Sequence, residues 1–96
     1  MKFLLIIYNA AVESQIIECM KECEIKTYTK FPGLHGVGTH SDPHLDTHVW
    51  PGVNNAFLIA LDEQKINPLV EKVKKFKQEQ LQEGVKAFVL PLERVI

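Results

Sequence analysis

The spacing of apolar residues changes several times in the first third of the chain, and each change predicts a new element. Residues 2–8 are almost continuously apolar, as a buried strand is. Residues 9–23 then place apolar side chains three and four positions apart, which is the spacing of one helix face, and Asn9 is suited to cap that helix. Residues 24–31 alternate between two sides, with Ile25 on the same side as Phe31. This alternation predicts a second strand.

The last part of the chain repeats this order. Residues 54–62 form another apolar run and predict a buried strand. We expect a helix next, capped by Asn67 with Pro68 in its first turn, where a proline loses no helical hydrogen bond. Residues 85–92 predict the fourth strand, and Pro91 is expected near its end because proline cannot donate to a neighbouring strand. The predicted order is strand, helix, strand, long loop, strand, helix, strand.

Two such strand-helix-strand units with right-handed crossovers predict an α+β fold, the ferredoxin-like βαββαβ sandwich. It has a four-stranded antiparallel sheet, two helices on one face and the long loop between strands 2 and 3, and we expect it to span residues 1–96 as a single domain. The first strand is apolar on both sides, and so are residues 56–61. Because two helices cover only one face, we predict an oligomer whose subunits bury their bare faces against each other.

The charge balance and the length of the apolar runs argue against several classes of protein. Lys and Arg number 11 and Asp and Glu number 12, and a net charge of −1 disfavours a nucleic-acid surface. The longest apolar runs, residues 3–8 and 56–61, are far shorter than the roughly 20 residues that span a membrane. Cys19 and Cys23 lie four apart in a predicted helix, where a disulfide would be strained, so we expect free thiols. These features predict a cytoplasmic protein that is not membrane-embedded.

Residues 32–53 have no periodicity, and they contain all 4 histidines of the chain. A connection of this length is unusual in a compact domain and indicates a functional loop. Its imidazole and carboxylate groups are ligands for divalent transition metals such as zinc, nickel and copper. The candidate metal ligands are His35, His40, Asp42, His44, Asp46 and His48. A metal site and a loop of solvated histidines both fit this spacing, because no cysteine joins the cluster and the spacing matches no strict zinc motif.

The chain offers little for catalysis. Ser41 lies beside His40, but in a segment rich in glycine and proline that does not hold a base within hydrogen-bond reach of a nucleophile. Paired carboxylates would also need a rigid, shielded setting that this segment does not offer. We therefore assign no catalytic residue and do not expect an enzyme. A small ferredoxin-like enzyme that uses a loop histidine is kept as the third interpretation.

Four segments resemble the PII-like signalling proteins of the nitrogen regulatory protein P-II superfamily, and together they run through nearly the whole chain. They are Phe3-Leu4-Leu5-Ile6-Ile7, Tyr28-Thr29-Lys30-Phe31-Pro32-Gly33, Leu61-Asp62-Glu63-Gln64-Lys65 and Gly84-Val85-Lys86-Ala87-Phe88-Val89-Leu90-Pro91-Leu92-Glu93. The resemblance implies a homotrimer with its sheets packed inward and a cleft between subunits that binds adenine nucleotides or a related small effector. It also implies a signalling loop, the T-loop, at residues 32–53, whose shape controls a membrane transporter or an enzyme.

The resemblance also suggests effector-binding residues. By position, Lys86 matches the phosphate-contacting lysine of the family, Gly84 belongs to the turn before it, and Gly33 or Gly36 stands where a glycine at the loop base approaches the nucleotide. The turn differs from the family's pattern, because Glu83 precedes Gly84 where glycines are usual. The sequence also ends before the arginine-bearing C-terminal segment of the nitrogen regulators. These differences weigh against adenine nucleotide as the ligand.

The first interpretation is therefore a PII-like regulatory protein that senses a small effector between subunits and signals through its long loop. The second is a metal sensor or carrier that binds a divalent transition metal at the histidine-rich loop. Some PII-like relatives, and the similarly folded trimeric CutA proteins, are associated with metal tolerance, which agrees with the ligands in the loop.

Overall fold

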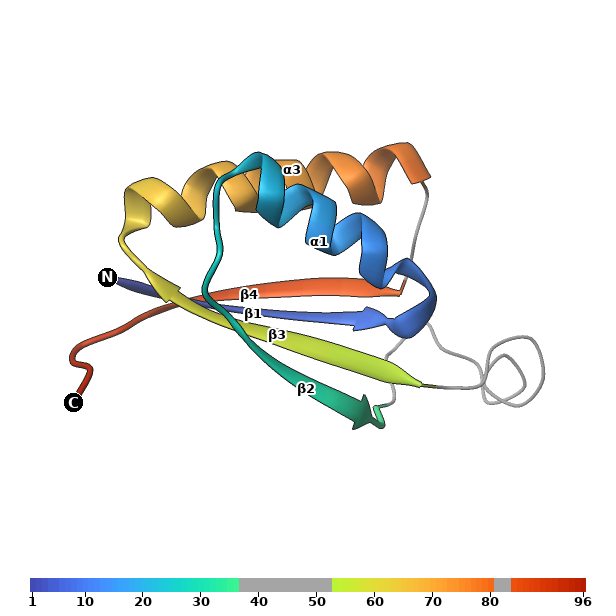
Figure 1. Ribbon diagram of the computed structural model, residues 1–96, viewed down its shortest axis with the longest axis horizontal. Helices are drawn as coiled ribbons and strands as arrows, with labels where there is room; N and C mark the ends of the chain where they lie inside the picture. Colours follow the sequence, from blue (N-terminus) through green and yellow to red (C-terminus); the bar gives the residue numbers. More distant parts are fainter. Residues whose placement is uncertain (37–52, 81–83) are drawn as a thin grey trace.

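The computed structural model describes residues 1–36, 53–80 and 84–96, and their strands form one antiparallel sheet (Figure 1). In chain order the elements are β1 (Lys2–Asn9), the 3-10 turn η1 (Ala10–Val12), α1 (Glu13–Glu22), β2 (Thr29–Leu34), β3 (Asn54–Leu61), α3 (Glu63–Gln80) and β4 (Val85–Pro91). The strand order is β2-β3-β1-β4, and each neighbouring pair is antiparallel. Both helices lie on one face of the sheet. The predicted ferredoxin-like α+β sandwich is confirmed.

The core lies between the sheet and the two helices. Alternate residues of β1 and β3 point toward the helices, and the apolar faces of α1 and α3 close over them. The side chains that are almost completely buried in this layer include Leu4, Ile6, Tyr8, Ile16, Met20, Phe57, Ile59, Ile66, Leu69 and Val73. The helical spacing in the sequence therefore marked the buried face of each helix correctly. Cys19 is buried in the same core, Cys23 packs against it, and both are free thiols as expected.

The opposite face of the sheet has no cover among the described residues (Figure 1). The register places Leu5 of β1 between Leu58 of β3 and Phe88 of β4, in a row of apolar side chains across this face. The same alternation brings Phe31 and Leu90 to this side, and both are more than two-fifths exposed. The strand pattern had predicted a bare apolar face, and the register confirms it. We call this surface the open face.

The second strand begins five residues later than the alternation predicted. Glu24, two residues after the end of α1, has a positive φ of 58°. Its N–H donates to the Lys21 carbonyl, and the Ile25 N–H donates to the Met20 carbonyl. This pair of bonds is a Schellman end, which satisfies the last carbonyls of the helix. It directs Ile25 into the core, so the prediction that Ile25 lies on the same side as Phe31 was wrong. Regular pairing with β3 starts at Thr29.

Strand β2 also continues past the predicted start of the loop. Pro32 lies inside it, which is permitted because β2 is an edge strand and needs partners on one side only. Pairing with β3 shifts between Phe31 and Leu34, where β2 has an extra residue, and Gly33 in this bulge has a φ of 69°. The prediction that the loop starts at residue 32 was therefore wrong by three residues.

The second helix begins four residues before the predicted cap. The carbonyl of Asp62 accepts hydrogen bonds from the N–H groups of Lys65 and Ile66, so Pro68 lies inside α3 and not in its first turn. Pro68 removes one helical hydrogen bond, and a proline inside a helix costs about 3 kcal/mol, although its ring lies on the exposed side here. Extending the helix brings Ile66 into the core, where it is fully buried. No helix in the described ranges has the length and hydropathy needed to cross a membrane.

Candidate functional site

The four residues proposed to bind an effector lie at one end of the sheet. Gly33 is near the end of β2 and Gly36 follows that strand, whereas Gly84 and Lys86 lie at the start of β4. Strands β1 and β2 both run antiparallel to β3, and β4 runs antiparallel to β1. The end of β2 and the start of β4 therefore lie at the same end of the sheet, where β2 leads into the long loop (Figure 1). They are on opposite edges, three strand spacings apart, or about 14 Å. One copy of the chain therefore brings the residues to one end without joining them in one pocket.

Lys86 is in an unusual place for a lysine. It pairs with Ile7 of β1, and the alternation of β4 puts it on the open face with Phe88. It is exposed, and it is the single charged side chain on that face within the described strands. A lone ammonium at the border of an apolar surface can bind an anionic group, and it would be costly to cover without one.

Gly84 holds the start of β4 against the end of β1. Its carbonyl accepts a hydrogen bond of 2.8 Å from the N–H of Asn9, and a Cβ atom at this position would meet the Asn9 Cβ at 3.2 Å. Asn9 in turn caps the first helical turn, since its side chain accepts from the N–H of Ala11. The close approach favours glycine at position 84, and strand pairing with Ile7 places Lys86 two residues later.

A polar cluster that the sequence did not reveal lies at the same end of the sheet, on the side of the helices. The Glu13 carboxylate accepts from the Tyr8 hydroxyl at 2.6 Å and from the Asn55 Nδ2 at 3.0 Å, both at Oε1. The Lys30 ammonium lies 2.9 Å from Oε1 and 3.0 Å from Oε2. The Asn55 Oδ1 accepts from the N–H of Gly33 at 3.1 Å. Four elements therefore meet at one carboxylate, next to the base of the loop.

The pKa values in this cluster follow from its geometry. The hydrogen bond from Lys30, and after it the one from Tyr8, lowers the pKa of Glu13, because both stabilise the ionised carboxylate. Burial, and then the hydrogen bond to Glu13, raises the pKa of the Tyr8 hydroxyl. Near neutral pH the Glu13 carboxyl is therefore ionised and the Tyr8 hydroxyl is neutral. No buried side-chain nitrogen or oxygen among the described residues lacks a partner.

A prediction about stability follows from the lowered pKa of Glu13. A carboxyl group with a depressed folded-state pKa stabilises the fold above its unfolded-state pKa and loses that contribution as the pH falls through the folded-state value. At pH 7, Glu13→Gln should lower the free energy of unfolding by about 1–3 kcal/mol, since hydrogen bonds to an ionised group are lost. The difference from the wild type should shrink below about pH 4. Urea titrations at a series of pH values measure it.

The matched control for that series is Glu22→Gln. Glu22 is on the same helix and forms an exposed ion pair with Lys72 at 3.6 Å, which is worth little. It should change stability by less than about 1 kcal/mol at every pH. A Glu13→Gln difference that stays constant from pH 7 to pH 3 would contradict the assignment of an ionised, stabilising Glu13.

The residues predicted to bind a metal fall mostly outside the described part of the chain. His35 is described and exposed, whereas the other five candidate ligands, His40, Asp42, His44, Asp46 and His48, lie in residues 37–52 and outside it. Within the described residues, no three His, Cys, Asp or Glu side chains gather as metal ligands do. The metal site therefore receives no support here and stays a prediction from the sequence.

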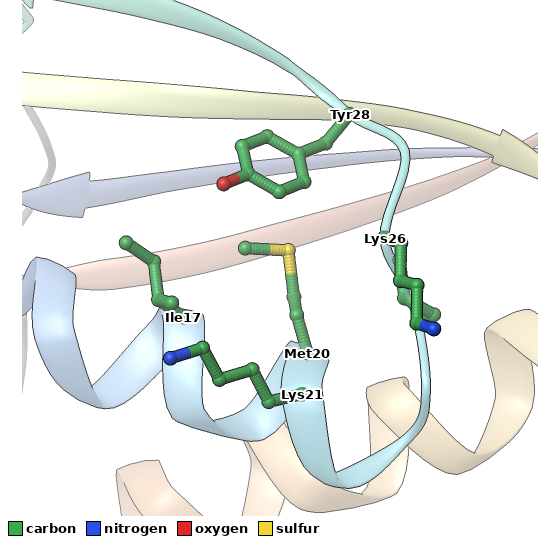
Figure 2. Close-up of a pocket in the computed structure, with 6 residues that line it drawn as sticks. Ile17, Met20, Lys21, Lys26 and Tyr28 are labelled. Atoms are coloured by element: carbon green, nitrogen blue, oxygen red, sulfur yellow. The ribbon is translucent and has the colours of Figure 1, made fainter.

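A small open pocket of about 180 Å³ lies between α1 and the segment that leads into β2 (Figure 2). Met20 extends from α1 toward the ring of Tyr28, and two lysines stand at the sides. The lining residues are Ile17, Met20, Lys21, Ile25, Lys26 and Tyr28. The volume is below the range of about 300–1,000 Å³ that is usual for small-molecule sites. None of the predicted effector residues lines this pocket.

Comparison with solved structures finds the same fold in PII-like proteins. CPII from Thiomonas intermedia K12, a nitrogen regulatory PII-like protein solved with ADP, AMP and bicarbonate, is 23% identical, with a TM-score of 0.68 over 99% of this chain and 94% of that one. CPII solved with ADP, AMP and acetate is 21% identical, with a TM-score of 0.71 over 97% and 88%. A protein of Thermus thermophilus described as a PII-like signaling protein is 21% identical, with a TM-score of 0.60 over 93% and 83%.

These identities are low and show a shared fold. No curated protein matches the sequence. The sequence profile of the family described as Nitrogen regulatory protein P-II, in contrast, matches residues 1–96, which is the whole chain. The resemblance seen in the four segments is therefore confirmed, and this chain belongs to the nitrogen regulatory protein P-II family.

Proposed function

We propose that the protein is a PII-like signalling protein that binds a small anionic effector between neighbouring copies of the chain and responds through the loop between β2 and β3. The proposed site is formed by Gly33 and Gly36 of one copy with Gly84 and Lys86 of the next. The observation that carries the proposal is the place of Lys86, an exposed ammonium and the single charged side chain of the described strands on the open face, at the end of the sheet where the loop begins.

The open face supports the assembly that this site requires. A face with Leu5, Leu58 and Phe88 in one row favours association with further copies of the same face, because water contact with large apolar groups is costly. The two halves of the site lie about 14 Å apart on opposite edges of one sheet. Association of several copies would bring the β2 end of one chain toward the β4 start of another. A homotrimer is the proposed state, as the resemblance implies.

An adenine nucleotide is the first effector to test. The differences around Gly84 weighed against a nucleotide, but CPII, a protein of the same fold, has been solved with ADP and AMP. Bicarbonate, also seen with CPII, is the second candidate. Both ligands are anions that suit the Lys86 ammonium. The regulated target, a membrane transporter or an enzyme, and the cytoplasmic location are proposals that rest on the family alone.

Lys86→Ala should reduce effector affinity strongly. A hydrogen bond to a charged group contributes about 1.5–3 kcal/mol, so the Kd for the nucleotide should rise roughly 10- to 100-fold. Isothermal titration of the wild-type protein with ATP, ADP, AMP and bicarbonate identifies the ligand, and the same titration of the variant measures the loss. Lys74→Ala is the control, because Lys74 is exposed on α3, where it pairs only with Glu71 at 3.4 Å among the described residues.

The two variants separate a local effect from a general loss of positive charge. Binding that weakens equally in both would argue against a specific role for Lys86. A wild-type protein that binds none of the four ligands at millimolar concentration would contradict the proposed effector class.

A further inference from the structure

The polar cluster around Glu13 links a helix to the first residues of the loop. Glu13 is the first residue of α1, and Asn55 is near the start of β3 with 6% of its surface exposed. Asn55 donates to Glu13 with one end of its amide and accepts from the Gly33 N–H with the other. Gly33 is in the left-handed bulge that ends β2, two residues before His35. We propose that Glu13, acting through Asn55, is a positioning residue that fixes the base of the loop.

The direction of control follows from hydrogen-bond chemistry. An ionised carboxylate can only accept, so the Asn55 amide must turn its Nδ2 toward Glu13. The Oδ1 atom is then directed at Gly33, where the backbone N–H needs an acceptor. A neutral group at position 13 removes this requirement, and the amide can turn its oxygen the other way. Gly33 then loses its partner, although no residue of the loop has changed.

Two other groups keep Glu13 in this state. Lys30 of β2 supplies the neighbouring positive charge, Tyr8 of β1 donates a hydroxyl, and the Tyr8 ring is stacked on Phe57 at 5.0 Å. These groups hold the carboxylate in place from two strands of the sheet. A charge-assisted cluster of this kind keeps its geometry better than a single neutral bond.

The consequence for signalling rests on the proposed function. If the loop base forms part of the effector site, then a displaced Gly33 weakens effector binding while leaving Lys86 unchanged. The positioning itself does not depend on that function, because it can be measured in the protein without any effector. Failure of one can therefore be told from failure of the other.

The test is amide hydrogen exchange by NMR on the effector-free protein, with the Gly33 amide as probe and the Ile6 amide, in the centre of β1, as reference. Loss of one neutral hydrogen bond should speed exchange at Gly33 roughly 5- to 10-fold more than at Ile6 in Glu13→Gln. Glu18→Gln is the matched control, because Glu18 is exposed on the same helix and should leave both amides unchanged. Equal changes at Gly33 and Ile6 in Glu13→Gln would overturn the proposal.

A double variant separates positioning from a simple loss of stability. In Glu13→Gln with Asn55→Asp, the new amide can donate to the new carboxylate, which can still accept from Gly33 and pair with Lys30. Protection of Gly33 should return to within about 3-fold of the wild type, whereas Asn55→Ala alone should not retain it. A double variant as unprotected as Glu13→Gln would overturn the proposal. Once an effector of the wild-type protein is known, the Kd of the Glu13→Gln variant for it should be roughly 5- to 10-fold higher than the Kd of the wild type.

Discussion

Phe88→Glu should dissociate the assembly while leaving the fold of the single chain intact. Phe88 is on the open face beside Leu5 and is 45% exposed in the isolated chain, so a glutamate there has access to water in the monomer. In an oligomer built on this face, the same glutamate would be buried without a partner. Losing the burial of one large apolar side chain alone costs roughly 1.5–3 kcal/mol per subunit. Sedimentation velocity at micromolar concentration should show the wild type as an oligomer and the variant as a folded monomer.

Val89→Glu is a close control for this experiment. Val89 is the next residue of β4, is 44% exposed and pairs with Leu4, so it points to the side of the helices. The two variants add the same charge at neighbouring positions of equal exposure, on opposite faces of one strand. Val89→Glu should sediment like the wild type. A wild-type protein that is a folded monomer, or equal dissociation of both variants, would contradict burial of the open face.

Phe57→Ala should cause the largest loss of stability of any variant considered. Phe57 is 1% exposed and lies at the centre of the helix-covered core. Its ring stacks on Tyr8 at 5.0 Å and meets the edge of Tyr28 at 4.9 Å, so the truncation removes two aromatic contacts besides leaving a cavity. Replacing a buried phenylalanine by alanine costs about 3–5 kcal/mol. Urea unfolding followed by circular dichroism, at one fixed protein concentration, measures the difference.

Phe57→Leu is the graded control, because it keeps most of the apolar volume and should cost less than about 2 kcal/mol. Val89→Ala, on the same side of the sheet but exposed, should cost less than about 1 kcal/mol. If Phe57→Ala and Val89→Ala were equally mild, the helix-covered layer would not be the main core of the protein.

The fold was largely readable from the sequence because its strands and helices differ in period. On any strand, successive side chains point to opposite faces, so one face of β1 carries Leu4, Ile6 and Tyr8 and the other carries Leu5 and Ile7, whichever strands are its neighbours. Errors occurred where local geometry overrides periodicity. The alternation in the sequence places Ile25 on the same side as Phe31. In the structure, the left-handed conformation of Glu24 changes the direction of the chain and brings Ile25 into the core. Pro68 resembles a first-turn proline, but burial of Ile66 extends the helix upstream of it.

The polar cluster could not be read in the same way. Its members Tyr8, Glu13, Lys30 and Asn55 come from four elements, and up to 42 positions of sequence separate a bonded pair. A weak signal exists, since Asn55 is a polar residue at the start of an otherwise apolar run. Asparagine is also one of the residues that commonly flank a strand, so the pattern alone does not identify its partner.

By itself, the sequence determined the order of the elements, the apolar open face and the membership of the P-II family, because these depend on the spacing and type of neighbouring residues. Only the tertiary structure decided that Glu13 meets Asn55 and that Asn55 holds Gly33, because those contacts depend on which strands become neighbours. It also placed Gly33 and Lys86 at one end of the sheet but on opposite edges. Spacing along a chain specifies which face a side chain takes, whereas strand order and register specify what it meets there.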